Sequence, residues 1–159
     1  MRNARFCIVI SQAEELAVDA RRSISSYCYT ECMAYCCRRG YLLLSEKEVS
    51  LMKDTKIETL KTMPKNLETD SKRYIFNIGL KPQGCPNLIK YKCTIHKNPD
   101  RPKPCKEYPL FVFENTVIIT DECPAVKENK LYPFLTQFKA MGYKIVYSDK
   151  KINNKSSDE

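Results

Sequence analysis

Apolar residues recur at helical spacing near the start of the chain. Ser11 and Glu14 form a capping-box pattern, in which each side chain can accept a hydrogen bond from the backbone N–H of the other residue. The residues that follow place one apolar face along the segment, at Leu16, Ala20, Ile24 and Tyr27. The pattern therefore predicts an amphipathic helix over residues 12–27.

This helix leads directly into a dense run of cysteines with the spacing C-x3-C-x3-C-C. If the helix continued, Cys28, Cys32 and Cys36 would lie along one of its faces, because i and i+4 positions stack on a helix. The neighbouring Cys37 would then need a bend in the chain to join them. Gly40 is typical of the residue that ends a helix.

A second capping box, Ser45–Glu48, predicts another helix over residues 46–54, with Val49 and Met52 facing inward. Residues 55–73 are polar and charged, so we expect a loop or a frayed helix there. Strand-forming residues are more frequent in the second half of the chain. They predict a strand and two hairpins, over residues 74–80, 87–96 and 110–119.

The end of the pattern is again helical. Phe134, Leu135 and Phe138 predict the inward face of a helix over residues 131–141, and residues 144–147 should form a last short strand.

Two further cysteines lie in or directly after turn-forming segments. Prolines and a glycine around Cys85 predict a tight turn, and the proline-rich residues 98–104 should present Cys105 from a stiff loop.

Composition indicates the cellular compartment and the chemical state of the cysteines. The chain has 159 residues and nine cysteines, about 6% of the total, which is below the level of a small disulfide scaffold. The apolar run Phe6–Ile10 is too short for a secretory signal, and no stretch approaches a membrane span. We therefore expect a cytoplasmic protein with no membrane partner. In a reducing cytosol, clustered cysteines bind metal more often than they form disulfides, although disulfides and inert core cysteines remain alternatives.

The cysteines fall into two groups along the sequence, with Cys7 alone near the start, where we interpret it as buried core. Thiolates in two separate groups suit either a tetrahedral zinc site or an iron–sulfur cluster. Eight thiols that include an adjacent pair exceed one zinc site, so an iron–sulfur cluster is slightly preferred over Zn²⁺. The predicted metal ligands are Cys28, Cys32, Cys36, Cys37, Cys85, Cys93, Cys105 and Cys123.

These elements and ligands together predict an α+β fold. It would be a small single domain over residues 1–147, with short helices and β-hairpins organised around the cysteine-ligated metal centre. Its core would span residues 28–124, and the charged residues 148–159 should form a disordered tail. The lone histidine, His96, follows Cys93 and is either an additional ligand or, more simply, a loop histidine.

The charge of the chain has two interpretations. Its formal net charge is +8, but each ligating cysteine would lose a proton, so part of the basicity offsets sulfur charge. Binding to nucleic acid is therefore only weakly supported. Four tyrosines near the first cysteines could stack on bases, but more often such residues form an apolar wall around a cluster: Tyr27, Tyr29, Tyr35 and Tyr41. The four glycines are isolated, so they make no phosphate-binding or dinucleotide loop.

The cysteine pattern resembles the YkgJ-type cysteine-cluster family, a zinc- or iron-chelating domain described by the motif CxxCxxCC. The resemblance spans residues 28–124, and its more specific half runs from Cys93 to Pro109. Three details depart from the family pattern. Three residues, not two, separate Cys32 from the cysteine pair. His96 stands where the family usually has tyrosine, and Lys106 stands where it usually has arginine.

The resemblance implies that eight cysteines ligate the metal. It leaves the biological role open between three hypotheses. The leading one is a metal-binding protein with a redox role or an accessory role for a modification enzyme, which would act with an unknown protein partner. The second is a zinc-stabilised module that binds nucleic acid or protein, and the third is an enzyme related to protein lysine N-methylases. Whether the chain is an enzyme stays uncertain from its sequence.

Overall fold

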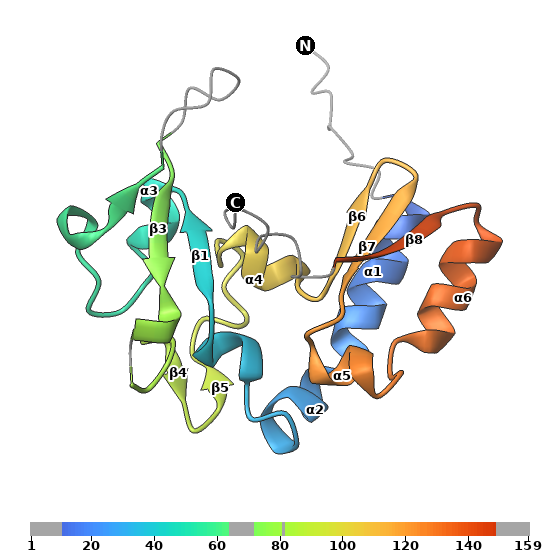
Figure 1. Cartoon of the computed structure of the whole chain (residues 1–159), viewed down its shortest axis with the longest axis horizontal. Coiled ribbons are helices and arrows are strands. Elements are labelled where there is room, and N and C mark those ends of the chain that lie inside the picture. Colours follow the sequence, from blue (N-terminus) through green and yellow to red (C-terminus); the bar gives the residue numbers. More distant parts are fainter. Residues whose placement is uncertain (1–10, 64–71, 81, 149–159) are drawn as a thin grey trace, which may run out of the picture.

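The computed structural model describes residues 11–63, 72–80 and 82–148, which form two lobes lying side by side (Figure 1). The first lobe contains residues 11–34 and 108–148, and the second contains residues 41–63, 72–80 and 82–98. Each lobe has its own cluster of buried apolar residues. The predictions for Cys7 and for the tail beyond residue 148 lie outside the described residues.

The first lobe begins with α1 (Gln12–Ser23), which starts where the capping pattern predicts, because the Ser11 side chain accepts a hydrogen bond from the Glu14 backbone. Three buried alanines let this helix pack closely on the neighbouring sheet: Ala13, Ala17 and Ala20. The helix breaks at Ile24 and resumes as α2 (Ser25–Thr30). The predicted helix over residues 12–27 is therefore two helices, the second ending beyond Tyr27.

The sheet of the first lobe has the strand order β6-β7-β8. A hairpin joins β6 (Leu110–Phe113) to β7 (Thr116–Thr120), as predicted. The chain returns through α5 (Pro124–Lys127) and α6 (Tyr132–Ala140) to β8 (Lys144–Ser148), which runs parallel to β7. The fully buried Phe138 of α6 lies at the centre of this core, together with Leu110, Val117 and Ile119.

The second lobe is a smaller sheet covered by a short helix. Its strands, in the order β1-β3-β2, are β1 (Tyr41–Leu44), β3 (Tyr74–Asn77) and β2 (Lys61–Thr62). Beside them is α3 (Glu46–Val49), whose capping box forms as predicted and whose Val49 is buried, as is Met52 beyond it. The helix is shorter than the predicted 46–54, because Leu51 and Met52 donate i−3 hydrogen bonds and Asp54 has a left-handed φ of 53°.

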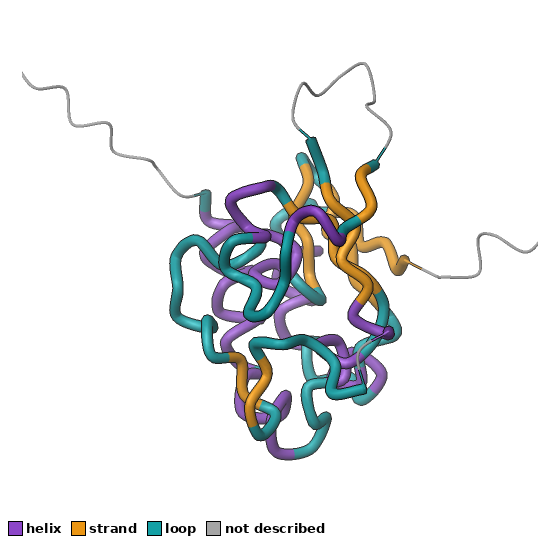
Figure 2. Tube along the Cα trace, turned by 90° about the vertical axis from the view of Figure 1, so that its left-hand side faces the viewer, coloured by secondary structure: helices purple, strands orange, loops and turns teal. Residues whose placement is uncertain are grey.

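Short elements fill the region between and below the lobes. The hairpin of β4 (Leu88–Ile89) and β5 (Lys92–Cys93) lies at the same end of the molecule as α2 in two perpendicular views (Figures 1 and 2). The helix α4 (Lys103–Glu107) lies between the lobes. The other short helices are η1 (Tyr35–Arg38), η2 (Ile57–Thr59) and η3 (Ile78–Leu80).

Several of these elements differ from the sequence predictions. Residues 98–104 do not continue as a loop up to Cys105, because α4 begins at Lys103 and carries this cysteine. The strand β1 was predicted by no pattern, since its residues Tyr-Leu-Leu-Leu do not alternate between apolar and polar. The mixture of helices and strands agrees with the α+β class. No helix of the described residues is both long enough and apolar enough to span a bilayer.

Candidate metal centre

The adjacent cysteines Cys36 and Cys37 lie in the turn that joins the two lobes. After α2, Met33 and Ala34 adopt left-handed φ angles of 53° and 52°, and the Ala34 N–H donates to the Cys28 carbonyl at 2.6 Å. This reversal ends the helical path, and η1 then carries the pair, whose sulfurs are 4.0 Å apart. The helix therefore does not continue to Cys36, and Cys28, Cys32 and Cys36 do not share one helix face.

Four thiols lie on the side of the first lobe. Cys28 and Cys32 pack against its core, Cys123 is buried within it, and Cys36 interacts electrostatically with both Cys28 and Cys123. Burial raises the pKa of Cys28 to about 12, and the charges of its cysteine neighbours act in the same direction. We call these four the first-lobe thiols: Cys28, Cys32, Cys36 and Cys123.

The other four thiols lie on the side of the second lobe. Cys37 interacts electrostatically with Cys85, Cys93 and Cys105, which come from a turn, from β5 and from α4. Burial raises the pKa of Cys85 to about 11 and that of Cys105 to about 12. We call this set the second-lobe thiols: Cys37, Cys85, Cys93 and Cys105.

A close backbone contact fixes the position of Cys85. Its N–H donates to the Cys37 carbonyl at 2.7 Å, which joins the predicted turn directly to η1. Gly84 makes this approach possible, because a Cβ at that position would lie 2.6 Å from the Cys37 carbonyl oxygen. Gly84 also has a φ of 78°, which only glycine adopts without strain. The turn predicted around Cys85 therefore places this thiol beside η1.

Arg101 provides positive charge beside the second-lobe thiols. The hydrogen bond from Cys36 lowers the pKa of Cys37, and the charge of Arg101 acts in the same direction against burial. Burial raises the pKa of Cys93, although hydrogen bonds from the Ile95 backbone and from Arg101 oppose the rise. The Nε of Arg101 is buried and has no hydrogen-bond partner among the described residues. An anionic sulfur centre beside Arg101 would satisfy this nitrogen, so the surroundings fit a bound metal–thiolate group.

His96 contacts Arg101 rather than a group of thiols. Its Nδ1 lies 2.6 Å from an Arg101 terminal nitrogen, and as arginine can only donate, this ring nitrogen acts as the acceptor. The partial burial of His96 lowers its pKa, and the charges of Arg101 and Lys97 lower it further. The ring is exposed, in agreement with the interpretation as a loop histidine.

One tyrosine beside the first-lobe thiols was not singled out by the sequence patterns. Burial raises the pKa of Tyr108, and nearby Cys123, Cys36 and Cys32 raise it further. Of the four tyrosines predicted as a wall, Tyr27 is buried and donates to Glu128 at 2.7 Å, whereas Tyr41 is 65% exposed. Tyr108 follows Cys105 in the segment that carries the family resemblance, and this position is the sequence signal that could have identified it.

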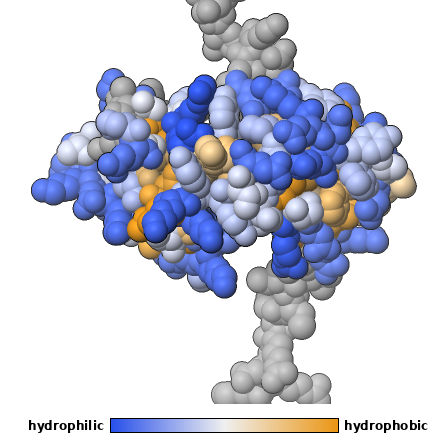
Figure 3. Space-filling model, turned by 90° about the horizontal axis from the view of Figure 1, so that it is seen from below, coloured by the Kyte–Doolittle hydropathy of each residue, from blue (hydrophilic) through white to orange (hydrophobic). Residues whose placement is uncertain are grey.

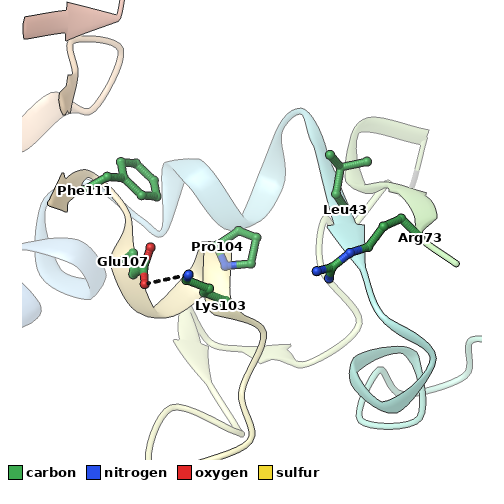
Figure 4. Close-up of a pocket in the computed structure, with 6 residues that line it drawn as sticks. All are labelled: Leu43, Arg73, Lys103, Pro104, Glu107 and Phe111. Atoms are coloured by element: carbon green, nitrogen blue, oxygen red, sulfur yellow. Dashed lines mark ion pairs between the residues drawn. The ribbon is translucent and has the colours of Figure 1, made fainter. Parts of the chain in front are cut away.

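A separate cavity of about 340 Å³ opens between β1 and α4 (Figure 4). Lys103 and Glu107 face each other across one turn of α4, with an ion-pair distance of 3.8 Å, and Arg73 points in from the second lobe. The lining includes no cysteine. Its lining consists of charged and apolar side chains and includes no thiol or hydroxyl group. The thiols are therefore the stronger candidate for the functional site.

The chemistry of the donors is clear, but their arrangement is not that of a formed site. All eight cysteines of the described residues are free, and none is paired in a disulfide. No three cysteine, histidine or carboxylate side chains in this part of the chain are close enough to hold one ion as they stand. The donor type and number nevertheless suit zinc or iron, whose preferred ligands include thiolates.

Comparison with known proteins identifies the family. Residues 27–129, more than half of the chain, match the family model CxxCxxCC, described as "Putative zinc- or iron-chelating domain". The chain belongs to this family. The match covers all eight cysteines of the two thiol sets and confirms the resemblance inferred from their spacing. No curated protein and no solved structure matches the chain.

Proposed function

We propose that this CxxCxxCC-family protein binds zinc or iron through the eight cysteines of the first-lobe and second-lobe thiols. The observation that carries the proposal is their convergence: segments spread from Cys28 to Cys123 bring thiols to the two sides of η1. The buried Arg101 Nε is a second support, because it needs an acceptor that the described residues do not provide.

An iron–sulfur cluster is the slightly preferred occupant, with zinc as the alternative. Both take thiolate ligands, and an iron cluster would supply one-electron redox chemistry when bound. The chain's own residues would hold the group, keep water away and balance its charge. Tyr108 and the core around Cys123 exclude water on one side, and Arg101 supplies positive charge on the other. The proposed role is redox, or accessory to a modification enzyme, in the reducing cytosol.

Metal and sulfide analysis of protein purified without oxygen tests this proposal. Near-stoichiometric iron and sulfide, with visible absorption, would identify a cluster. A colourless sample with zinc would identify a structural centre. A control variant, Cys7→Ser, alters a cysteine outside both thiol sets and should keep the metal content of the wild type. Protein that retains neither metal while all its thiols remain reduced would contradict the proposal.

The second candidate function is a zinc-stabilised module that binds an acidic partner or nucleic acid. Hydrophilic side chains cover much of the end of the molecule that carries the β4–β5 hairpin (Figure 3). Basic side chains are exposed at the end of η1 and on the hairpin: Arg38, Arg39, Lys90 and Lys92. Titration with a labelled single-stranded oligonucleotide at several salt concentrations tests it. Binding that weakens steeply with salt supports this function, and no binding at low salt contradicts it.

A further inference from the structure

We infer that the eight cysteines form two separate four-thiolate centres, with the boundary between the adjacent residues Cys36 and Cys37. One centre would use the first-lobe thiols, and the other would use the second-lobe thiols. This inference rests on the proposed metal-binding function and adds the number of centres and the ligands of each. It also replaces the grouping along the sequence, because Cys123 joins the early cysteines and Cys37 joins the later ones.

The neighbours of the two adjacent thiols assign them to different sets. Their separation of 4.0 Å would by itself allow one zinc ion to hold both, since sulfurs on a tetrahedral zinc are about 3.8 Å apart for a bond of about 2.3 Å. Their other neighbours differ, however. The strongest thiol neighbours of Cys36 beyond Cys37 are Cys28 and Cys123. Cys37 is the strongest thiol neighbour of three second-lobe thiols, Cys85, Cys93 and Cys105, whereas for the first-lobe thiol Cys28 it is the weakest one.

The backbone supports the same division. Cys28, Cys32 and Cys123 belong to the first hydrophobic core or pack against it, and Cys85 packs against the second. The carbonyl of Cys37 accepts the Cys85 N–H at 2.7 Å, which ties Cys37 to the second lobe. The Cys32 sulfur accepts the Tyr35 N–H at 3.3 Å, which ties Cys32 to the entry of η1 from the first lobe. The first-lobe thiols therefore lie on one side of η1, and the second-lobe thiols lie on the other.

The number of donors also favours two centres. Each set contains four thiols, which is the ligand number of a closed structural zinc site and of a common iron–sulfur cluster. Both sets are complete without His96 and without any carboxylate. A lone centre with four ligands would leave four half-buried thiols unused beside it, and several of these thiols are desolvated.

The two centres would differ in charge. Arg101 interacts with three second-lobe thiols, Cys37, Cys93 and Cys105. Beside the first-lobe thiols lie the neutral ring of Tyr108 and, near Cys123, the charge of Lys127. Because the half-buried guanidinium of Arg101 offsets thiolate charge more strongly than the exposed ammonium of Lys127 does, we expect the two centres to release metal at different chelator concentrations.

Metal-protected alkylation of single variants tests the division. The protein is purified without oxygen as Cys36→Ser and as Cys37→Ser, treated with iodoacetamide, and mapped cysteine by cysteine by mass spectrometry. We expect each variant to keep half of the wild-type metal. In Cys36→Ser, alkylation should appear at Cys28, Cys32 and Cys123, and in Cys37→Ser it should appear at Cys85, Cys93 and Cys105. Cys7→Ser should keep all of the metal.

The results that would contradict the division differ from those that would contradict the proposed function. Wild-type protein without zinc or iron overturns metal binding itself. If the wild type binds metal enough for only one centre, or if both variants show the same alkylation pattern, only the division is overturned. If either variant fails to fold, stepwise removal of metal from the wild type with a chelator gives the answer. Thiols should then become alkylated in two sets of four, whereas simultaneous exposure of all eight overturns two centres.

Discussion

Arg101 carries the one buried side-chain nitrogen among the described residues that lacks a hydrogen-bond partner. Its guanidinium contacts His96 and interacts electrostatically with three second-lobe thiols: Cys37, Cys93 and Cys105. A guanidinium is strongly favoured beside an anionic sulfur, because its N–H groups donate and its charge offsets the thiolates. The residue therefore belongs to the surroundings of the proposed second centre, although it is not a ligand.

Replacing Arg101 should weaken metal retention without removing a ligand. For Arg101→Gln we expect about 10-fold weaker retention, at the low end of the range for residues that support metal ligands. Arg101→Lys keeps the charge but loses the planar set of donors, so its loss should be smaller. Competition with a coloured chelator measures both. The control Arg39→Gln alters an exposed arginine that lies over the Tyr35 ring. Equal retention by all three variants would contradict this role.

Asn87 is the buried polar side chain that joins the start of the cysteine-bearing hairpin to the segment after α3. Its Oδ1 accepts the Lys53 N–H at 3.0 Å, and its Nδ2 donates to the Leu51 carbonyl at 2.9 Å. Asn87→Ala would leave both backbone groups without partners, so we expect a loss of about 1–3 kcal/mol in the free energy of unfolding. Urea denaturation measures it. Asn77→Ala, at an exposed position of β3, should cost much less; an equal loss would contradict this account.

Glu48 connects two elements through one carboxylate. It completes the capping box of α3 by accepting the Ser45 N–H at 2.8 Å, and it accepts the Lys103 N–H at the start of α4 at 2.9 Å. Although burial opposes the shift, these hydrogen bonds lower the pKa of Glu48. A lowered folded-state pKa means that the ionised carboxylate stabilises the fold above its unfolded pKa, and that this stability is lost as the pH falls.

The pH dependence of Glu48→Gln tests this link. The variant should be less stable than wild type at pH 7, and the difference should shrink as the pH is lowered toward 4, because wild type then loses its carboxylate. Urea unfolding at several pH values measures the difference, in which any general effect of acid on both proteins cancels. Glu46→Gln, also in the first turn of α3, is the control. A difference that stays constant with pH would contradict the role assigned to the charge.

Gly84 decides whether the Cys85 turn can reach η1. Gly84→Ala would suffer from a φ of 78° and from contacts of 2.6 Å with the Cys37 carbonyl oxygen and 2.8 Å with the Arg38 Cα. Gly142 has a similar φ of 89° but open space around its Cβ direction, so Gly142→Ala isolates the backbone strain of about 1–2 kcal/mol. We expect Gly84→Ala to cost about 1–3 kcal/mol more in thermal or urea unfolding. Equal losses in both variants would contradict the close approach.

Local signals in the sequence predicted the elements that depend on neighbouring residues. The hairpin of β6 and β7, the capping box of α3 and the helix α6 follow from short patterns, and each is present. The positions of the thiols depend on distant contacts. The left-handed residues Met33 and Ala34, which turn the chain away from a helix, are not residues that favour this conformation. No sequence pattern could therefore divide Cys36 from Cys37, or bring Cys123 beside Cys28.

The two lobes differ in how much apolar surface they bury. Among the described residues, the first core contains 14 buried residues and the second contains 6. A core as small as the second rarely holds a fold by itself, and metal ions commonly supply the missing stability in such units. Of the second-lobe thiols, Cys85 packs against this small core, and the other three come from η1, from β5 and from α4. Metal binding should therefore stabilise the second lobe more than the first.

Amide hydrogen exchange before and after metal removal measures this difference. In the metal-bound protein, we expect the amides of β1 and β3 and those of β6 and β7 to be protected. After anaerobic treatment with a chelator and a thiol reductant, β1 and β3 should exchange rapidly, because their small core no longer has the thiol–metal bonds. The amides of β6 and β7 should stay protected by the larger core around Phe138. Simultaneous loss of protection in both sheets would mean that the lobes unfold as one unit, and unchanged protection of β1 and β3 would mean that the second lobe needs no metal.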